Sequence, residues 1–440
     1  MLRWSVWMVG FGVIILAVLW GLSRLQGATA DELAAMALLD VDQDFAGENA
    51  FDYLWLLQYD MPEDDHLSVL AEDTDRLEQW VTGFYRGETV SPPFLSVAAE
   101  RYADLRPEAD ELARFCAGMT SDCLARVRAD PDGYRALLDR HQRLLERASR
   151  AIQGKYLDNY FAPHLLAPTP SYQLAILPAT GHALAFIEGD IDAALARTCE
   201  QIADWNRLGR NTDHLIARMV ASTFVGGLYA HLLTDFLAEL PPGFALPEQC
   251  RLLERPPAPE TLSLCPAMRG EYRQVRAGTQ DLVQAEEAGR LLERAALAVT
   301  FRQDLSAAML APQYAQWCAP EMRTALMDDD PDPMMVEPGS VWQLRCIANW
   351  TGCVMSIIAM PDMSRYYRRQ LDHGARMHAL ATALWLHGQV DDGHNELPAD
   401  LVHGRVRITD AGIVVELLES SQADAVWSVP LPSSRWSPSD

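Results

Sequence analysis

The eight cysteines are the residues whose chemistry the sequence defines most clearly. Six residues, Ala-Gly-Met-Thr-Ser-Asp, separate Cys116 from Cys123 and favour a turn that brings the two Cα atoms within about 6 Å, a distance typical of a disulfide. Cys250 and Cys265 enclose the proline-rich segment 255–259, and a disulfide between them would close that loop. No C-x2-C pair occurs, so the cysteines predict disulfides rather than a zinc site.

The other four cysteines leave several pairings open. Cys346 and Cys353 lie seven residues apart on a predicted helix, where a separation of about 10 Å between their Cβ atoms prevents a disulfide unless the helix bends at Gly352. Cys199 and Cys318 remain for each other or for that pair. An even number of cysteines is typical of an oxidising compartment, where we therefore expect this part of the chain to lie.

Histidines and clustered aspartates do not form a metal-binding pattern. His373 and His378 are five residues apart, whereas two helical ligands on one face need a spacing of four. The remaining histidines of the C-terminal quarter do not improve on this spacing; they are His387, His394 and His403. We expect no bound metal and no cofactor.

One acidic segment resembles the start of a calcium loop without completing it, and the aspartates of a second, 328–332, could bind Ca²⁺ only weakly. Asp40, Asp42 and Asp44 have the spacing that begins such a loop, but Phe45 and Phe51 occupy the positions that need glycine and glutamate. The prolines within 328–333 favour an exposed loop for the aspartates there. We therefore expect solvated segments at both places.

No catalytic residue can be selected from the sequence. It contains no G-x-S-x-G, no H-E-x-x-H and no glycine-rich phosphate loop. Asp and Glu total 61 residues, so pairs of carboxylates are too numerous to identify a catalytic pair from spacing alone. A site built from carboxylates could still exist, because it leaves no local motif.

The elements that would position any site begin with an apolar N-terminal segment. Arg3 precedes an uncharged run, 4–22, that closes at Arg24. Nineteen residues at about 1.5 Å each match the hydrocarbon thickness of a bilayer, which favours a retained membrane anchor. The small residues of 28–30 also allow cleavage after Ala30 as a secretory signal.

Charge favours one orientation of this anchor. A short basic end precedes the span and an acidic chain follows it, so we expect a single pass through a bacterial inner membrane by residues 4–22, with the large domain in the periplasm. The formal net charge of −25 repels phosphate backbones, so we expect no nucleic-acid partner.

Helical periodicity dominates the rest of the chain and predicts a mainly α fold, with antiparallel helical hairpins or a bundle after the transmembrane helix. The expected helices are 33–39, 67–84, 112–116, 137–152, 172–187, 191–208, 215–240, 341–358 and 364–386, with one or two more within 260–310. Alternating residues predict a small C-terminal β-hairpin, 405–408 with 413–417, and a third strand at 425–430.

These elements predict four parts: an anchor or uncleaved signal, two helical subdomains, and a short β-hairpin with a polar tail. Their expected boundaries are 1–30, 31–250, 251–400 and 401–440.

Two segments resemble known groups of proteins. The segment 182–195, His-Ala-Leu-Ala-Phe-Ile-Glu-Gly-Asp-Ile-Asp-Ala-Ala-Leu, resembles the inter-helix region of one tetratricopeptide unit, which implies a helical hairpin suited to protein binding. The segments 376–386 and 395–401 resemble the end of uncharacterised bacterial membrane-anchored, mostly helical periplasmic proteins, and 49–60 is similar to the part near their anchor. This second resemblance implies a shared fold and carries over no catalytic residue.

We therefore expect a membrane-anchored periplasmic helical protein that binds a protein partner or supports an envelope assembly, through a groove beside 172–240. The alternative is a hydrolase of cell-envelope material with a carboxylate site in an interhelical cleft. A buried pair of Asp or Glu side chains facing a cleft would favour the hydrolase, whereas acids spread over the surface would favour the binding protein.

Overall fold

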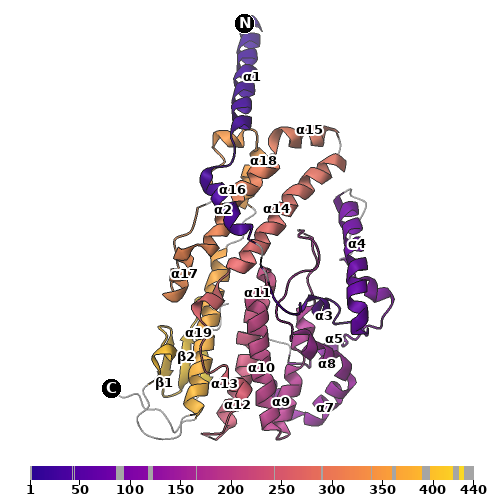
Figure 1. Ribbon diagram of the computed structural model, residues 1–440, viewed down its shortest axis with the longest axis vertical. Coiled ribbons are helices and arrows are strands. Elements are labelled where there is room, and N and C mark those ends of the chain that lie inside the picture. Colours follow the sequence, from indigo (N-terminus) through magenta and orange to yellow (C-terminus); the bar gives the residue numbers. More distant parts are fainter. Residues whose placement is uncertain are drawn as a thin grey trace.

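The chain folds into a mainly helical body with a small antiparallel sheet, as the sequence predicts (Figure 1). The structure is a computed structural model of the 440 residues. It describes residues 2–41, 43, 45–85, 94–116, 122–164, 166–241, 243–288, 291–337, 339–358, 363–388, 397–419 and 426–430. Asp42, Asp44, His394 and the polar tail 431–440, for which expectations are given above, lie outside these ranges.

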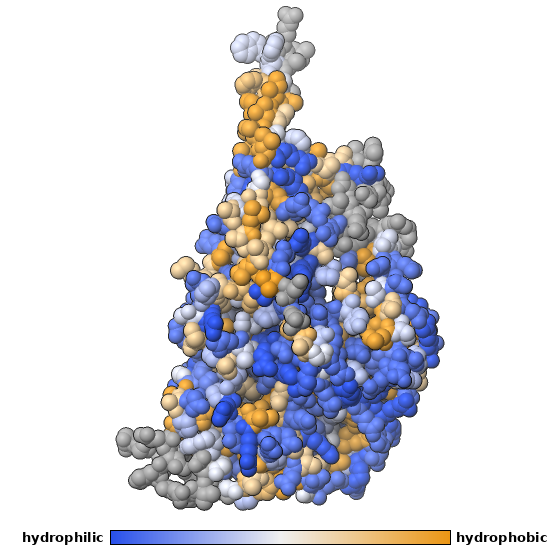
Figure 2. All heavy atoms as spheres, viewed as in Figure 1, coloured by the Kyte–Doolittle hydropathy of each residue, from blue (hydrophilic) through white to orange (hydrophobic). Residues whose placement is uncertain are grey.

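Helix α1, Leu2–Leu25, projects from the body, and apolar side chains cover it (Figures 1 and 2). Helix α2, Ala30–Leu39, follows after a bend of 46°, and Gly10–Leu25 of α1 together with α2 is long and apolar enough to cross a membrane. The capping box between Thr29 and Glu32 explains why α2 begins there: the Thr29 side chain accepts from Glu32 N, and the Glu32 carboxylate accepts from Thr29 N. The segment Leu215–Glu239 is by itself long and apolar enough to cross a membrane, but 72% of its apolar 18-residue stretch is buried inside the body.

The next part of the chain contains short helices around a large core. They are α3 Phe51–Trp55, α4 His66–Tyr85, α5 Ala109–Leu112, α6 Cys123–Ala129, α7 Pro131–Arg140 and α8 Gln142–Ala151, with 3₁₀ turns η1 Glu63–Asp65 and η2 Val97–Glu100. Two expectations were wrong in detail. The helix expected at 112–116 ends at Leu112, and the one expected at 137–152 begins at Pro131 and breaks at His141, whose φ of −105° and ψ of 16° are not helical.

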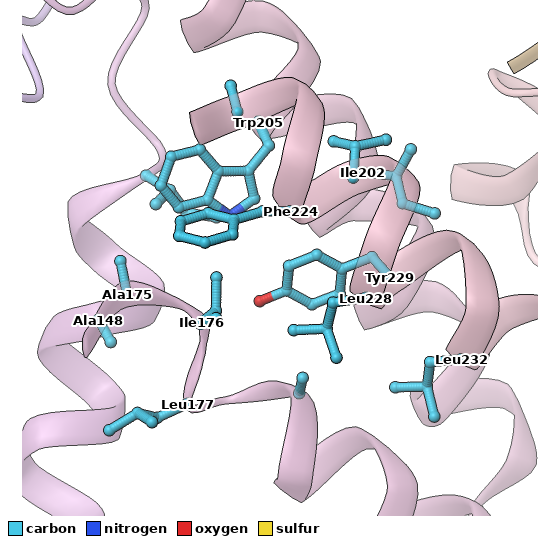
Figure 3. Packing of buried hydrophobic residues seen from close by; sticks show 14 of the residues in the cluster. Ala148, Ala175, Ile176, Leu177, Ile202, Trp205, Phe224, Leu228, Tyr229 and Leu232 are labelled. Carbon is cyan, nitrogen blue, oxygen red and sulfur yellow. The ribbon is translucent and has the colours of Figure 1, made fainter. Parts of the chain in front are cut away.

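The central helices line the largest core. They are η3 Tyr172–Ile176, α9 Ala179–Ile187, α10 Ile191–Arg210, α11 Leu215–Phe224, the π-helical turn η4 Val225–Tyr229 and α12 Ala230–Glu239. Gly189 has a φ of 91° between α9 and α10, and these two helices pack on each other. Figure 3 shows Trp205, Phe224 and Tyr229 from this region converging with Ile176 of η3.

The second half of the chain adds α-helices of four to 26 residues and short 3₁₀ turns. They are α13 Glu248–Arg251, η5 Pro259–Leu262, α14 Cys265–Ala288, α15 Leu291–Thr300, α16 Gln303–Ala315, η6 Gln316–Cys318, α17 Pro320–Met327, η7 Leu344–Cys346, α18 Trp350–Ile358, α19 Met363–Gly388 and η8 Ala399–Leu401. The core around α14, α16 and α19 is separate from the large one, but the C-terminal half of α19 joins the large core. The expected domain boundaries therefore stay predictions.

The expected strands form a three-stranded antiparallel sheet in the order β1-β2-β3. The strands are β1 Val406–Thr409, β2 Gly412–Glu416 and β3 Val426–Pro430. Gly412 allows the tight turn because its φ is 142° and a Cβ there would lie 2.2 Å from the carbonyl oxygen of Val429. Ile413, Val415, Trp427 and Val429 bury one face of the sheet on the large core.

The eight cysteines form four disulfides. Cys116 and Cys123 are bonded, with 5.4 Å between their Cα atoms. The expected bond between Cys250 and Cys265 was wrong, because the short helix α13 points Cys250 toward Cys199 of α10. Cys265, at the start of α14, instead pairs with Cys318 at the end of η6.

Cys346 and Cys353 also pair with each other. The continuous helix that would hold them apart is not present: Cys346 ends the turn η7, and α18 begins only at Trp350. Four residues outside an α-helix let the chain reverse and bring the two Cα atoms to 5.7 Å.

Candidate functional site

The site with the most distinctive chemistry is a cleft of about 440 Å³ beside the start of α11, which we call the carboxylate cleft. Four segments that are distant in sequence meet there, and their lining residues include Phe45, Asp158, Asp213 and Arg273. The cleft borders the 172–240 segment, where the functional groove was expected.

Backbone pairing places two aspartates side by side. Leu157 and Thr212 form an isolated parallel bridge, and Leu157 N donates to Asn211 O at 2.9 Å. Both bridge residues are buried, and successive side chains alternate in direction along extended backbone. The next residue of each segment, Asp158 and Asp213, therefore faces the cleft beside its counterpart.

The pKa of the Asp158 carboxyl lies in the neutral range, so a large share of this group is protonated near pH 7. Burial, followed by the charge of Asp213 and a side-chain hydrogen bond to it, raises the pKa of Asp158 to about 7. Asp213 is 7% exposed, and its Oδ1 has no other donor among the described residues. A proton on Asp158 supplies the donor that this buried oxygen needs.

Helix α14 holds Asp213 from the other side. The Arg273 guanidinium donates to Asp213 Oδ2 at 2.6 Å, which forms an ion pair. Close approach of α14 requires Gly270, because a Cβ there would lie 1.9 Å from the carbonyl oxygen of Asp213. The pair is therefore asymmetric: Arg273 stabilises a negative charge on Asp213, while Asp158 keeps the proton.

Two further titratable groups adjoin this pair. Gln274 Nε2 lies 3.3 Å from His214 Nε2, and burial lowers the pKa of His214, so the imidazole is a neutral acceptor. Burial raises the pKa of Glu271, although its acceptance of Leu215 N acts in the opposite direction. This bond caps α11 and fixes the loop that carries Asp213.

Aromatic and apolar side chains form the opposite part of the cleft. Phe161 is buried and packs edge-on against Phe51 at 5.5 Å between ring centroids, while Phe45 stacks on Tyr156 at the same distance. Ala162, Pro163 and Ala167 extend this surface. A substrate in the cleft would contact carboxyl groups on one side and apolar groups on the other.

The histidines considered in the sequence lie elsewhere. His378 and His403 line a separate cleft of about 590 Å³, with 4.6 Å between their ring centroids, and His403 lies 3.8 Å from Asp329. Burial, then the charge of His403, lowers the pKa of His378 to about 4. Among the described residues no group of three or more His, Cys, Asp or Glu side chains could hold a metal ion.

Sequence reasoning did not select Asp158, Asp213 or Arg273. The two aspartates are 55 positions apart in segments without a motif, and only the bridge between Leu157 and Thr212 brings them together. No local signal could have identified them. The disulfide candidates Cys116, Cys123, Cys250 and Cys265 do not line the carboxylate cleft.

Comparison with known proteins adds no assignment. No protein-family model matches the chain, and searches of curated proteins and of solved structures find no match. The two resemblances described from the sequence therefore stay predictions.

Proposed function

We propose that the protein is a membrane-anchored hydrolase of the cell envelope that cleaves amide bonds in its carboxylate cleft. The observation that carries this proposal is the pairing of Asp158, half-buried and with a pKa raised to about 7, with the buried Asp213, because both side chains line one cleft. Such a pair is the feature that favours the hydrolase over the partner-binding protein. Binding of a protein partner stays a prediction.

The spacing of the two carboxyls favours acyl rather than glycoside chemistry. The pair of carboxyls in a glycosidase is separated by about 5 Å or more, which leaves room for the sugar and, in inverting enzymes, a water. Asp158 and Asp213 are hydrogen-bonded to each other, as in a dyad of aspartic-protease type that shares one proton.

The proposed reaction uses Asp158 in its protonated form and Asp213 as a carboxylate. Asp213 accepts a proton from water, and the water oxygen adds to the amide carbon while Asp158 donates its proton to the carbonyl oxygen. The proton held by Asp213 then passes to the amide nitrogen, and the C–N bond breaks as the carbonyl re-forms and returns its proton to Asp158. Arg273 keeps Asp213 in position throughout.

Membrane anchoring by α1 is part of this proposal, and contacts at its base support retention of the segment. Ser23 is fully buried, and its Oγ accepts from Ala348 N at 2.9 Å. Trp20 Nε1 donates to Val299 O, and Arg302 donates to Ser23 O. Cleavage after Ala30 would remove these contacts and divide the capping box of α2.

The body also exposes apolar side chains next to the base of α1. Val299 lies in the last turn of α15 and is 48% exposed, while Trp350 and Ile358 at the two ends of α18 are 47% and 73% exposed. Figure 1 shows α15 and α18 at the end of the body from which α1 emerges. Tryptophan and aliphatic groups suit the membrane interface, so this face would rest on the bilayer.

An assay of the full-length protein in detergent micelles tests the activity. The substrates are purified peptidoglycan and a mixed-sequence fluorogenic peptide library, and the readout is released amine. We expect release by the wild type and a loss of about 100-fold or more in Asp213→Asn and in Asp158→Asn, the size expected for general acid–base groups. Asp192→Asn removes an exposed acid on α10 and should keep the wild-type rate.

Two results would contradict the proposal: no amine release from either substrate, or wild-type rates in both cleft variants. Circular dichroism and the thermal midpoint of each variant separate a chemical loss from unfolding.

A further inference from the structure

A second, smaller cleft concentrates arginine in a strongly acidic protein. This cleft has a volume of about 210 Å³ and lies between α11 and α19; we call it the arginine pocket. Arg365, Arg369 and Arg376 line it from one face of α19, and Met219, Ser222 and Thr223 line it from α11. The carboxylates in its lining are Asp372 and Glu419.

Other cations already neutralise both carboxylates. Asp372 binds Arg405 at 2.7 Å and also accepts from the backbone N of Leu418 and of Glu419. Glu419 lies 3.4 Å from Arg365 and 3.6 Å from Arg368. These ion pairs leave Arg369 and Arg376 without a carboxylate partner in the described part of the chain.

A buried arginine next to the pocket and a half-buried one in its lining both have no carboxylate partner among the described residues. Arg218 is 5% exposed, and its guanidinium donates to three neutral acceptors, Gln370 Oε1, Gly209 O and Thr261 O. Arg376 packs over Gly226, and its Nε is buried without an acceptor among the described residues. Unpaired guanidinium groups in a half-buried site are unfavourable unless an anion compensates them.

One buried side chain in the lining has an unused polar atom. His373 is 6% exposed, and its Nε2 lies 2.9 Å from Asn206 Oδ1, which makes Nε2 the donor. Its Nδ1 is buried and has no donor among the described residues. Burial, with the charges of Arg218 and Arg376, lowers the pKa of His373 to about 3, so the ring is neutral and Nδ1 is an acceptor.

We propose that the arginine pocket binds a phosphate group, either free phosphate or that of a small phosphorylated molecule. Arg369 and Arg376 supply guanidinium donors, and the Thr223 hydroxyl adds a neutral donor at the rim. The acceptor at His373 Nδ1 suits the P–OH of a monohydrogen phosphate. Ser222 does not take part, since it donates to Arg218 O and accepts from Gln370. Guanidinium groups match the several oxygens of phosphate better than a point charge does.

Calorimetric titration of the full-length protein in detergent tests this site, with inorganic phosphate, glycerol phosphate and acetate as separate probes. We expect saturable binding of at least one phosphate probe and much weaker binding of acetate, which has one charge and no P–OH. The tighter of the two phosphate probes identifies the source of the group.

Substitutions locate the binding. Arg369→Gln changes an exposed side chain that forms no ion pair among the described residues, and it should weaken the binding by about tenfold or more, as expected for lost hydrogen bonds to a charged group. Arg376→Gln should do the same. Arg323→Gln is the matched control, because Arg323 is exposed, pairs with Glu260 and lies outside the pocket. Absence of heat with both phosphate probes, equal binding of acetate, or unchanged binding in Arg369→Gln would overturn the proposal.

Discussion

Asp158 keeps its proton because burial and the charge of Asp213 both oppose its ionisation. Asp213, in contrast, is paired with Arg273, so the two chemically identical side chains lie in different electrostatic environments. This difference allows one to act as an acid and the other as a base at the same pH. Loss of the Asp158 proton above a pH of about 7 should therefore lower hydrolytic activity.

At the residue scale, Asp158→Asn should change how stability depends on pH. The pKa of Asp158 rises from 3.8 to about 7 on folding, so between these values the folded protein holds a proton that the unfolded chain has released. Rising pH therefore lowers the free energy of unfolding over this interval. As pH rises through this interval, the free energy of unfolding of Asp158→Asn should therefore fall by about 1 kcal/mol or more less than that of the wild type, since one pKa unit corresponds to about 1.4 kcal/mol.

Urea unfolding at pH 4.5 and at pH 7.5 measures this effect. Asp192→Asn serves as the control, because its side chain is exposed and lies on α10 away from the cleft lining. A pH difference in Asp158→Asn equal to that of the wild type would show that Asp158 titrates alike in the folded and unfolded states.

At the scale of elements, the cleft depends on how closely α14 approaches the loop before α11. Gly270→Ala would place a Cβ 1.9 Å from the Asp213 carbonyl oxygen, so α14 must move and Arg273 must withdraw from Asp213. We expect a loss of about 1–3 kcal/mol, as for overpacking, together with reduced amide hydrolysis. Thermal and urea unfolding measure the first effect.

Gly181→Ala provides the comparison for this substitution. A Cβ at Gly181 meets only Leu138 Cδ1 at 3.9 Å, and the residue lies in α9. Alanine should be tolerated there or slightly stabilising. Equal stability of the two variants would show that close approach at Gly270 is not required.

Local signals in the sequence predict many of the elements. Thr29 and Glu32 predict the start of α2, and the turn at 410–412 predicts the β1–β2 hairpin. Signals that depend on tertiary packing fail: the partners of Cys250 and Cys265 lie 51 and 53 residues away, so proximity along the chain selects the wrong bond. The sequence does not predict the carboxylate cleft for the same reason, because a single backbone bridge between distant segments assembles it.

The sequence could have indicated the arginine pocket. Arg365, Arg369 and Arg376 follow helical spacing on one face of α19, in a chain with 36 basic and 61 acidic residues. An arginine face of this kind is a signal for an anion. What the sequence lacks is the arrangement of partners, since only the fold shows which of these arginines are already paired.

At the scale of the whole molecule, the proposed function requires α1 to lie in the membrane and both clefts to lie outside the cytoplasm. A fluorescent reporter that matures only in the cytoplasm, fused after Asp440, should stay dark, and a periplasm-active enzyme at the same position should work. The reason is the charge around α1, with Arg3 at the short end and an acidic body after Arg24. Bright cytoplasmic fluorescence would reverse the orientation and remove the oxidising compartment that the four disulfides favour.

Measuring the protonation of Asp158 tests the proposed hydrolytic site most directly. Infrared difference spectra between the full-length wild type and Asp158→Asn isolate the C=O stretch of the protonated Asp158 carboxyl, and this band can be followed from pH 3 to pH 9 in detergent micelles. We expect a band that is half lost near pH 7, and at lower pH in Asp213→Asn, because the charge of Asp213 is removed. A band that disappears near pH 4 in the wild type, as for an ordinary aspartate, would show that the two carboxyls share no proton and would contradict the proposed hydrolytic site.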